Sequence, residues 1–181
     1  MPHRPRLSPS LLVAMCLATL PAAARAQTVS AECKPLLDAQ RKEITTPHHA
    51  YSTQSPAGQR ARKTTGETIY AGGANYLFYK GKWMRSPLTM QMQLDQMQEN
   101  IKNAKVLSCR REGEESVGGV AAVVYTTHTE NEDTKADARH WVAKSSGLLL
   151  RTEEDIDTGD GDRRHVSVRY EYTNVRPPAV Q

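Results

Sequence analysis

Aromatic side chains are scarce in this chain, which has 181 residues but only one Phe, two Trp and seven Tyr. Its core must therefore be built mainly from aliphatic residues and methionine. Hydrophobic residues make up 38% of the chain and charged residues 24%. These proportions are typical of a soluble globular protein with one domain, and they argue against a multidomain assembly.

The sequence also lacks an apolar run long enough to span a bilayer, which takes about 20 helical residues. Its most apolar stretch, residues 11–20, follows a basic N-terminus and precedes Ala24-Arg25-Ala26. This order is typical of a secretory signal peptide, and the small residues predict cleavage after Ala26. Cys16 would suit a lipoprotein signal, but Met15 stands where a small residue is needed. We expect export to the periplasm and no integral membrane anchor.

A strong excess of positive charge is missing as well. The whole chain carries 24 basic and 20 acidic residues, a net charge of +4, but Arg4, Arg6 and Arg25 belong to the predicted signal peptide. The mature domain, residues 27–181, therefore has 21 basic and 20 acidic residues. Its densest basic cluster, residues 60–63, is best interpreted as a solvated strand or loop. The sequence predicts no nucleic-acid partner.

Cysteine is rare, and the predicted signal peptide removes Cys16. Cys33 and Cys109 remain as an even pair in an oxidising compartment, which predicts a disulfide between them. In the chain-entropy model, closing such a loop stabilises the fold by roughly 4 to 5 kcal/mol. Two buried free thiols are the alternative. No CxxC motif is present, so thiol exchange chemistry has little support.

Catalytic motifs are absent: neither a GxSxG elbow nor an HExxH helix occurs, and the sequence predicts a non-enzymatic protein without cofactors. Five histidines follow the signal peptide: His48, His49, His128, His140 and His165. We expect no metal site, although His128 and His140 could approach each other across a hairpin. The acidic segment Asp155–Asp162 offers oxygen ligands but lacks EF-hand spacing, which favours a hairpin turn.

Two segments have helical periodicity. Apolar residues from Val29 to Ile44 recur every three or four positions, with Ser30 as a candidate N-cap. A second helix is predicted from Pro87 to about Ala104, because Ser86-Pro87 suits an N-cap followed by the first helical position.

The rest of the chain favours strands. A short edge strand and a loop are expected within residues 48–62, and a three-stranded meander with glycine turns follows over residues 68–83. Five further strands are predicted at residues 106–112, 120–129, 138–143, 148–156 and 163–174. Neighbouring strands should pair antiparallel. Two helices must then cover one apolar face of the sheet or leave a cavity beneath them.

Methionine is concentrated around the second helix. Met84, Met90, Met92 and Met97 lie close in sequence to Trp83 and to the aromatic segment Tyr76–Tyr79. Flexible thioethers adapt to irregular apolar partners, so this cluster is a candidate lining for a pocket. Ordinary core filling in a protein poor in Phe explains the same residues.

Three motifs resemble those of a known family. The segment Trp141–Arg151 is similar to the pattern W-V-D-x-x-T-G-L-P-L-R of periplasmic proteins with the LolA/LolB lipoprotein-carrier fold, with Ala, Ser and Leu in place of its Asp, Thr and Pro. Gly81-Lys82-Trp83 resembles their G-x-W strand end. Val117–Tyr125 resembles their V-x-G-x-x-x-x-x-Y hairpin. The resemblance covers roughly residues 65–175.

The resemblance implies an α+β fold in which a curved antiparallel sheet of about seven or eight strands, a half-barrel, packs on two helices. It also implies a lipid, a lipoprotein acyl chain or another apolar ligand held between sheet and helices. The candidate ligand-binding residues are Tyr76, Phe78, Trp83, Met84, Met90, Leu94 and Met97. The alternative is a periplasmic protein-interaction module such as an inhibitor, an immunity protein or an accessory subunit of an envelope complex.

Overall fold

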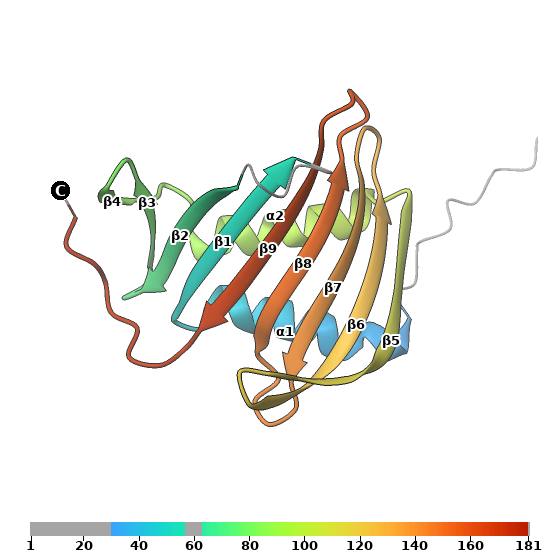
Figure 1. Cartoon of the computed structure of the whole chain (residues 1–181), viewed down its shortest axis with the longest axis horizontal. Helices are drawn as coiled ribbons and strands as arrows, with labels where there is room; N and C mark the ends of the chain where they lie inside the picture. Colours follow the sequence, from blue (N-terminus) through green and yellow to red (C-terminus); the bar gives the residue numbers. More distant parts are fainter. Residues whose placement is uncertain (1–29, 57–62, 181) are drawn as a thin grey trace, which may run out of the picture.

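The structure is a computed structural model that describes residues 30–56 and 63–180. The predicted signal peptide, its cleavage after Ala26 and most of the basic cluster at 60–63 lie outside the described residues. Within them, nine strands form one antiparallel sheet and two helices lie on one side of it (Figure 1). The predicted α+β fold class is confirmed.

The elements follow one another along the chain as a helix, four strands, a helix and five strands. The helices are α1 (Lys34–Thr45), preceded by a 3-10 turn at Ala31–Cys33, and α2 (Met90–Asn103). The strands are β1 (His48–Pro56), β2 (Thr64–Ala71), β3 (Ala74–Tyr79), β4 (Lys82–Arg85), β5 (Val106–Val117), β6 (Val120–Glu130), β7 (Lys135–Ala143), β8 (Leu149–Asp157) and β9 (Arg163–Glu171).

The sheet order is β4-β3-β2-β1-β9-β8-β7-β6-β5, and the sheet is not closed. β1 was expected at an edge, but it lies between β2 and β9. His48 pairs with Tyr70 on one side, while Ala50 pairs with Tyr170 on the other. The polar side chains that suggested an edge instead alternate between the two faces of a central strand. The true edges are β4 and β5, which α2 connects.

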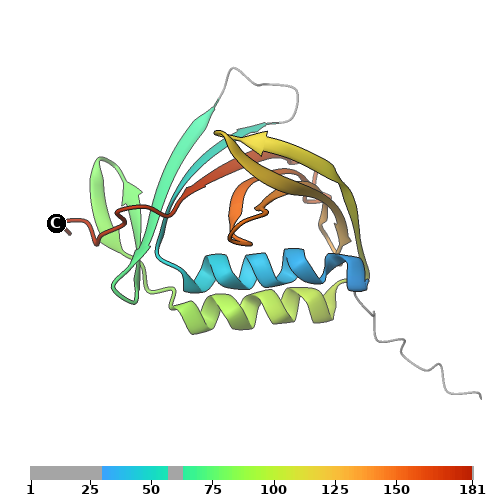
Figure 2. The same cartoon turned by 90° about the horizontal axis from the view of Figure 1, so that it is seen from below.

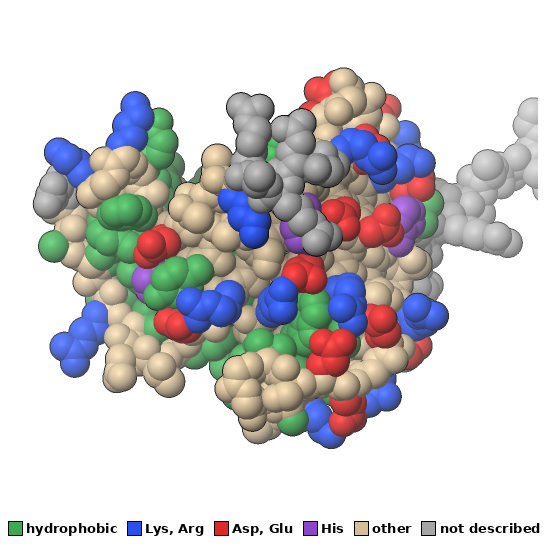
Figure 3. All heavy atoms as spheres, viewed as in Figure 1, with side chains coloured by type: hydrophobic (Ala, Val, Ile, Leu, Met, Phe, Trp, Pro, Cys, Tyr) green, Lys and Arg blue, Asp and Glu red, His purple; other side chains and the backbone are tan. Residues whose placement is uncertain are grey.

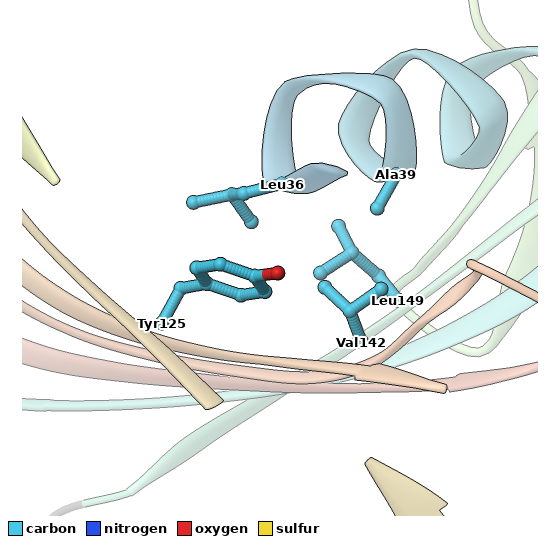
Figure 4. Close-up of a cluster of buried hydrophobic side chains, with 5 residues drawn as sticks. All are labelled: Leu36, Ala39, Tyr125, Val142 and Leu149. Carbon is cyan, nitrogen blue, oxygen red and sulfur yellow. The ribbon is translucent and has the colours of Figure 1, made fainter. Parts of the chain in front are cut away.

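Both helices cross the concave face of the curved sheet, and they run antiparallel to each other (Figures 1 and 2). α1 lies nearer the sheet, and the predicted helical periodicity is confirmed because Leu36, Ala39 and Ile44 are buried. Leu36 and Ala39 face Tyr125, Val142 and Leu149 of the sheet (Figure 4). This cluster fixes one end of α1 to the sheet. No described helix is both long and apolar enough to cross a membrane.

The second helix begins later than Ser86-Pro87 predicted. Its N-cap is Thr89, whose Oγ1 accepts a hydrogen bond from the Met92 backbone N–H at 3.2 Å. Ser86 lies in the preceding turn instead, where its Oγ accepts from the Leu88 N–H and its own N–H donates to the Asn75 carbonyl. The backbone bond to Asn75 ties Ser86 to β3, and the helix begins after an N-cap three residues further on.

Replacing Thr89 with Ala should therefore lower the free energy of unfolding by about 1 kcal/mol, because an N-terminal N–H of α2 loses its acceptor. The matched variant Ser86→Ala should cost less, since it caps no helix. Urea denaturation followed by circular dichroism measures both. An equal or larger loss for Ser86→Ala would contradict the assignment of the cap.

Candidate functional site

A cavity of about 830 Å³ lies between the two helices and the concave face of the sheet. α1 and α2 form one wall, and strands β5 to β9 form the other. No residue of α2 is fully buried, so this helix covers the cavity without packing tightly into the core. The volume falls within the range of about 300 to 1,000 Å³ that is usual for small-molecule pockets.

The lining of the cavity is mixed. The larger aliphatic residues are Leu36, Leu37, Ile44, Leu88, Met97, Ile101, Leu107, Leu149 and Ile156. The polar residues include Gln40, Gln93, Gln96, Asn100, Thr127, Thr129, Asn131, His140, Thr152 and Glu154. The helices contribute amides and the sheet contributes hydroxyls, a histidine and a carboxylate. A ligand with both apolar and hydrogen-bonding groups would match this surface better than a plain hydrocarbon.

His140 is the most buried polar side chain of the cavity wall, with 6% of its surface exposed. Its Nε2 lies 3.1 Å from Thr127 Oγ1, and its Nδ1 lies 3.2 Å from Thr152 Oγ1. Burial lowers the pKa of the imidazole to about 4. His140 is therefore neutral near pH 7, with one ring nitrogen donating and the other accepting.

A buried ion pair links α1 to the sheet at one end of the cavity. His48 Nδ1 lies 2.9 Å from the Thr46 carbonyl oxygen, which can only accept, so Nδ1 carries a proton. His48 Nε2 lies 3.0 Å from the Glu43 carboxylate, which also accepts, and His48 is thus an imidazolium. Burial acts to lower the pKa of His48, but the hydrogen bond and the charge of Glu43 raise it overall. The pair is neutral as a unit.

The seven residues predicted to bind ligand do not gather in one place. Met97 of α2 lines the cavity. Tyr76, Phe78 and Trp83 lie on the opposite, outer face of the sheet. Across the strands, Tyr76 is aligned with His49, while Phe78 and Trp83 are aligned with Tyr51. The residue between His49 and Tyr51, Ala50, is paired with Tyr170 of the cavity wall, so His49 and Tyr51 point to the other face.

Of the other three predicted residues, Met90 and Leu94 belong to α2 and Met84 belongs to β4, and none of them is among the residues that line the cavity. Met84 is 38% exposed, and Leu94 is half-buried. Met90 Sδ accepts a hydrogen bond from the Tyr70 hydroxyl at 3.4 Å, which joins the start of α2 to β2. A ligand-binding role for these residues stays a prediction.

Phe78 and Trp83 contact each other on this outer face beside His49 and Tyr51, and we call these four residues the outer aromatic cluster. The rings of His49 and Tyr51 stack at 4.0 Å, and the Phe78 and Trp83 ring centres are 5.3 Å apart. Hydrophobic side chains gather over β2 to β4, whereas Lys, Arg, Asp and Glu intermix over the other strands (Figure 3). Phe78 is 40% exposed.

Cys33 and Cys109 form the predicted disulfide, with their Cα atoms 5.9 Å apart. The bond joins the 3-10 turn before α1 to β5, and both cysteines line the cavity. The disulfide therefore holds the start of the first helix against the edge of the sheet.

Histidines 128 and 140 do not approach each other, although they lie on adjacent strands. His140 lies on the cavity face, whereas His128 lies on the outer face, where it contacts Asp137 and Glu130. Among the described residues, no three His, Cys, Asp or Glu side chains converge in a way that could hold a metal ion.

The acidic segment Asp155–Asp162 forms the end of β8 and the turn before β9. Asp157 accepts from the Gly159 N–H and Asp160 accepts from the Asp162 N–H, which are bonds typical of Asx turns. The hairpin interpretation of this segment is confirmed.

Sequence reasoning missed the polar residues of the cavity wall, notably Thr127, His140, Thr152 and Glu154. The available signal was the two-residue alternation, because Thr152, Glu154 and Ile156 share one face of β8. The adjacent strands β7 and β8 contain a register shift between Trp141 and Val142. This irregularity interrupts the inward-outward alternation of side chains within the Trp141–Arg151 segment. The sequence alone therefore could not show which residues of β8 face the cavity.

An open, curved sheet with two helices across its concave face and a cavity between the layers defines the protein as an α+β half-barrel. No protein-family model and no curated protein matches the sequence.

Several solved structures are similar at low identity. Lipoprotein LppX of Mycobacterium tuberculosis is 12% identical, with a TM-score of 0.48 over 83% of this chain and 97% of that one. MucB, solved in complex with MucA, is 15% identical, with a TM-score of 0.46 over 81% of this chain and 57% of that one. A LolA superfamily protein of Nitrosomonas europaea is 8% identical, with a TM-score of 0.23 over 78% of this chain and 92% of that one.

Proposed function

We propose that this protein is a periplasmic, non-enzymatic binding protein that holds an amphipathic or apolar ligand, such as a lipid or a lipoprotein acyl chain, between its sheet and its helices. The cavity of about 830 Å³ beneath the helices is the observation that carries the proposal. The periplasmic location is supported by the predicted signal peptide and by the Cys33–Cys109 disulfide, which needs an oxidising compartment.

The arrangement of the helices suits ligand entry. α1 is fixed to the sheet by the disulfide and by the buried residues Leu36 and Ala39. α2 has no fully buried residue, and its half-buried Met97 and Ile101 face the cavity. A small displacement of α2 would therefore open the cavity at low cost in buried apolar surface.

Filling the cavity tests the proposal. Ala136 lies on β7 in the cavity wall, and the variant Ala136→Phe should weaken binding of the neutral fluorescent probe N-phenyl-1-naphthylamine by about tenfold or more, or about 1.4 kcal/mol. Ala121→Phe is the matched control, because Ala121 is exposed on β6 and does not line the cavity. Circular dichroism should show both variants folded.

Organic extraction of the purified protein followed by mass spectrometry complements this titration by searching for a copurified ligand. The proposal fails if the wild-type protein binds no apolar probe. It also fails if folded Ala136→Phe binds the probe as tightly as Ala121→Phe.

A second candidate function, a protein-interaction module, is favoured by the outer aromatic cluster. Exposed aromatic residues beside an open sheet edge are typical of protein-binding surfaces. Phe78 and Trp83 lie on β3 and β4, and β4 is such an edge. A pull-down from periplasmic extract should then return one stoichiometric protein with the wild type and lose it with Phe78→Ser. Retention by that variant would contradict this alternative.

A further inference from the structure

The charges that line the cavity are all of one kind. Among its described lining residues there are two carboxylates, Glu43 and Glu154, and neither Lys nor Arg. Glu43 is neutralised by the imidazolium of His48 at 3.0 Å. His140 is neutral near pH 7, because burial lowers its pKa to about 4. Glu154 is therefore the group that sets the electrostatic character of the cavity.

Glu154 has no partner for its charge. Its cross-strand neighbours are Ala138 on β7 and Val166 on β9, which are both apolar. Within the part of the chain that the structure describes, its carboxylate forms no hydrogen bond and no ion pair. The carboxyl group is half-buried, and burial raises its pKa. Burying a carboxylate without a donor is costly, so a ligand that brings a donor to this position would gain free energy.

The arginine nearest to Glu154 by strand register does not line the cavity. Arg164 of β9 pairs across the strands with Ile156, one row beyond Glu154. One guanidinium nitrogen lies 3.6 Å from the Asp162 carboxylate, and the Nε is buried without a hydrogen-bond partner among the described residues. Arg164 lines a separate hollow with Gln54 and Lys63 and is not among the residues that line the cavity. It does not supply a cation to the cavity wall.

A second unsatisfied acceptor points to the same ligand chemistry. Asn131, which follows β6, lines the cavity, and its Oδ1 is buried without a hydrogen-bond partner among the described residues. Thr129, Ala136 and Ile156 are aligned across strands β6, β7 and β8. Asn131 lies beyond this line of residues at one end, and Glu154 lies on the opposite side of the line. The apolar side chains of Ile156 and Ala136 thus separate two acceptors that both call for N–H or O–H donors.

We propose that the cavity selects an amphiphile with a cationic amine head group, whose N–H groups donate to the Glu154 carboxylate while its apolar chain lies against Ile101, Leu107 and Ile156. An amphiphile with a carboxylate or phosphate head meets no cation in the cavity and is repelled by Glu154. This inference rests on the proposed function, because it names the head group that the same cavity prefers.

Displacement of N-phenyl-1-naphthylamine by three twelve-carbon probes tests the preference. Dodecylamine should displace the dye at about a tenth of the concentration that dodecanol needs, and dodecanoate should be the weakest of the three. Measurements at pH 7.5 keep the amine protonated and the carboxylate ionised.

The variant Glu154→Gln should abolish the preference for dodecylamine over dodecanol, since glutamine keeps the shape and loses the charge. Glu153→Gln is the matched control: Glu153 lies one residue away on the outer face, bonded to Arg151, and its replacement should change no affinity. Equal affinity for dodecylamine and dodecanoate, or an unchanged preference in Glu154→Gln, would overturn the head-group inference alone. Failure of all three probes to displace the dye would overturn the proposed function itself.

Discussion

Replacing both Cys33 and Cys109 with Ala should lower the free energy of unfolding by about 4 kcal/mol. The two residues are 76 positions apart, and a cross-link that closes a loop of this length removes much of the conformational entropy of the unfolded chain. Cys33 is 1% exposed, so its truncation also removes a buried side chain beside α1. A loss of this size is a large part of the stability of a typical domain.

The disulfide contribution can be separated from the packing contribution by urea denaturation with and without dithiothreitol. Reductant should shift the unfolding midpoint of the wild type strongly and leave the double alanine variant unchanged. The conservative variant Cys33→Ser/Cys109→Ser should be about as unstable as the reduced wild type or more so. An oxidised wild type that is less than about 1 kcal/mol more stable than its reduced form would contradict a structural role for the bond.

The order of the elements could be predicted from the sequence because the relevant signals are local. The burial of Leu36 and Ile44 follows from helical spacing. The motif resemblance has a physical basis too, since Trp141 and Arg151 are cross-strand partners and the guanidinium lies 5.0 Å from the ring centre. Tight turns and paired strand positions leave marks in the sequence that do not depend on distant contacts.

The candidate site could not be predicted because it depends on which face of each strand turns inward. Tyr76, Phe78 and Trp83 have the composition of a pocket lining, but the strand register places them on the outer face. Thr152 and Glu154 resemble surface residues in sequence, yet they face the cavity. A shift of one residue exchanges the two faces of a strand, and only the pairing of distant strands fixes that choice.

Acidification should destabilise the fold through His140, and this is the second large effect that we expect. The unfolded chain binds a proton at His140 below about pH 6.5, whereas the folded protein binds it only below about pH 4. Between these values, protons bind preferentially to the unfolded state. Stability from the neutral imidazole is thus complete above pH 6.5 and is lost as the pH falls towards 4, by about 3 kcal/mol in total.

The variant His140→Gln isolates this contribution, because glutamine can still bond to Thr127 or Thr152 but does not titrate. Urea denaturation of both proteins between pH 4 and 7.5 gives two stability curves. The wild-type value minus the His140→Gln value should increase from pH 4 to pH 6.5 and then level off. Glu154 titrates in both proteins, so its own contribution cancels from the difference unless the two side chains interact.

His128→Gln supplies a control of opposite sign. Hydrogen bonds to Asp137 and Glu130 raise the pKa of His128, so its stabilising contribution is present below pH 6.5 and is lost as the pH rises through the raised value. The wild-type value minus the His128→Gln value should therefore decrease with rising pH, whereas the His140 difference increases. Two differences with the same slope, or a flat His140 difference, would show that His140 is not held neutral by burial in the wall of the cavity.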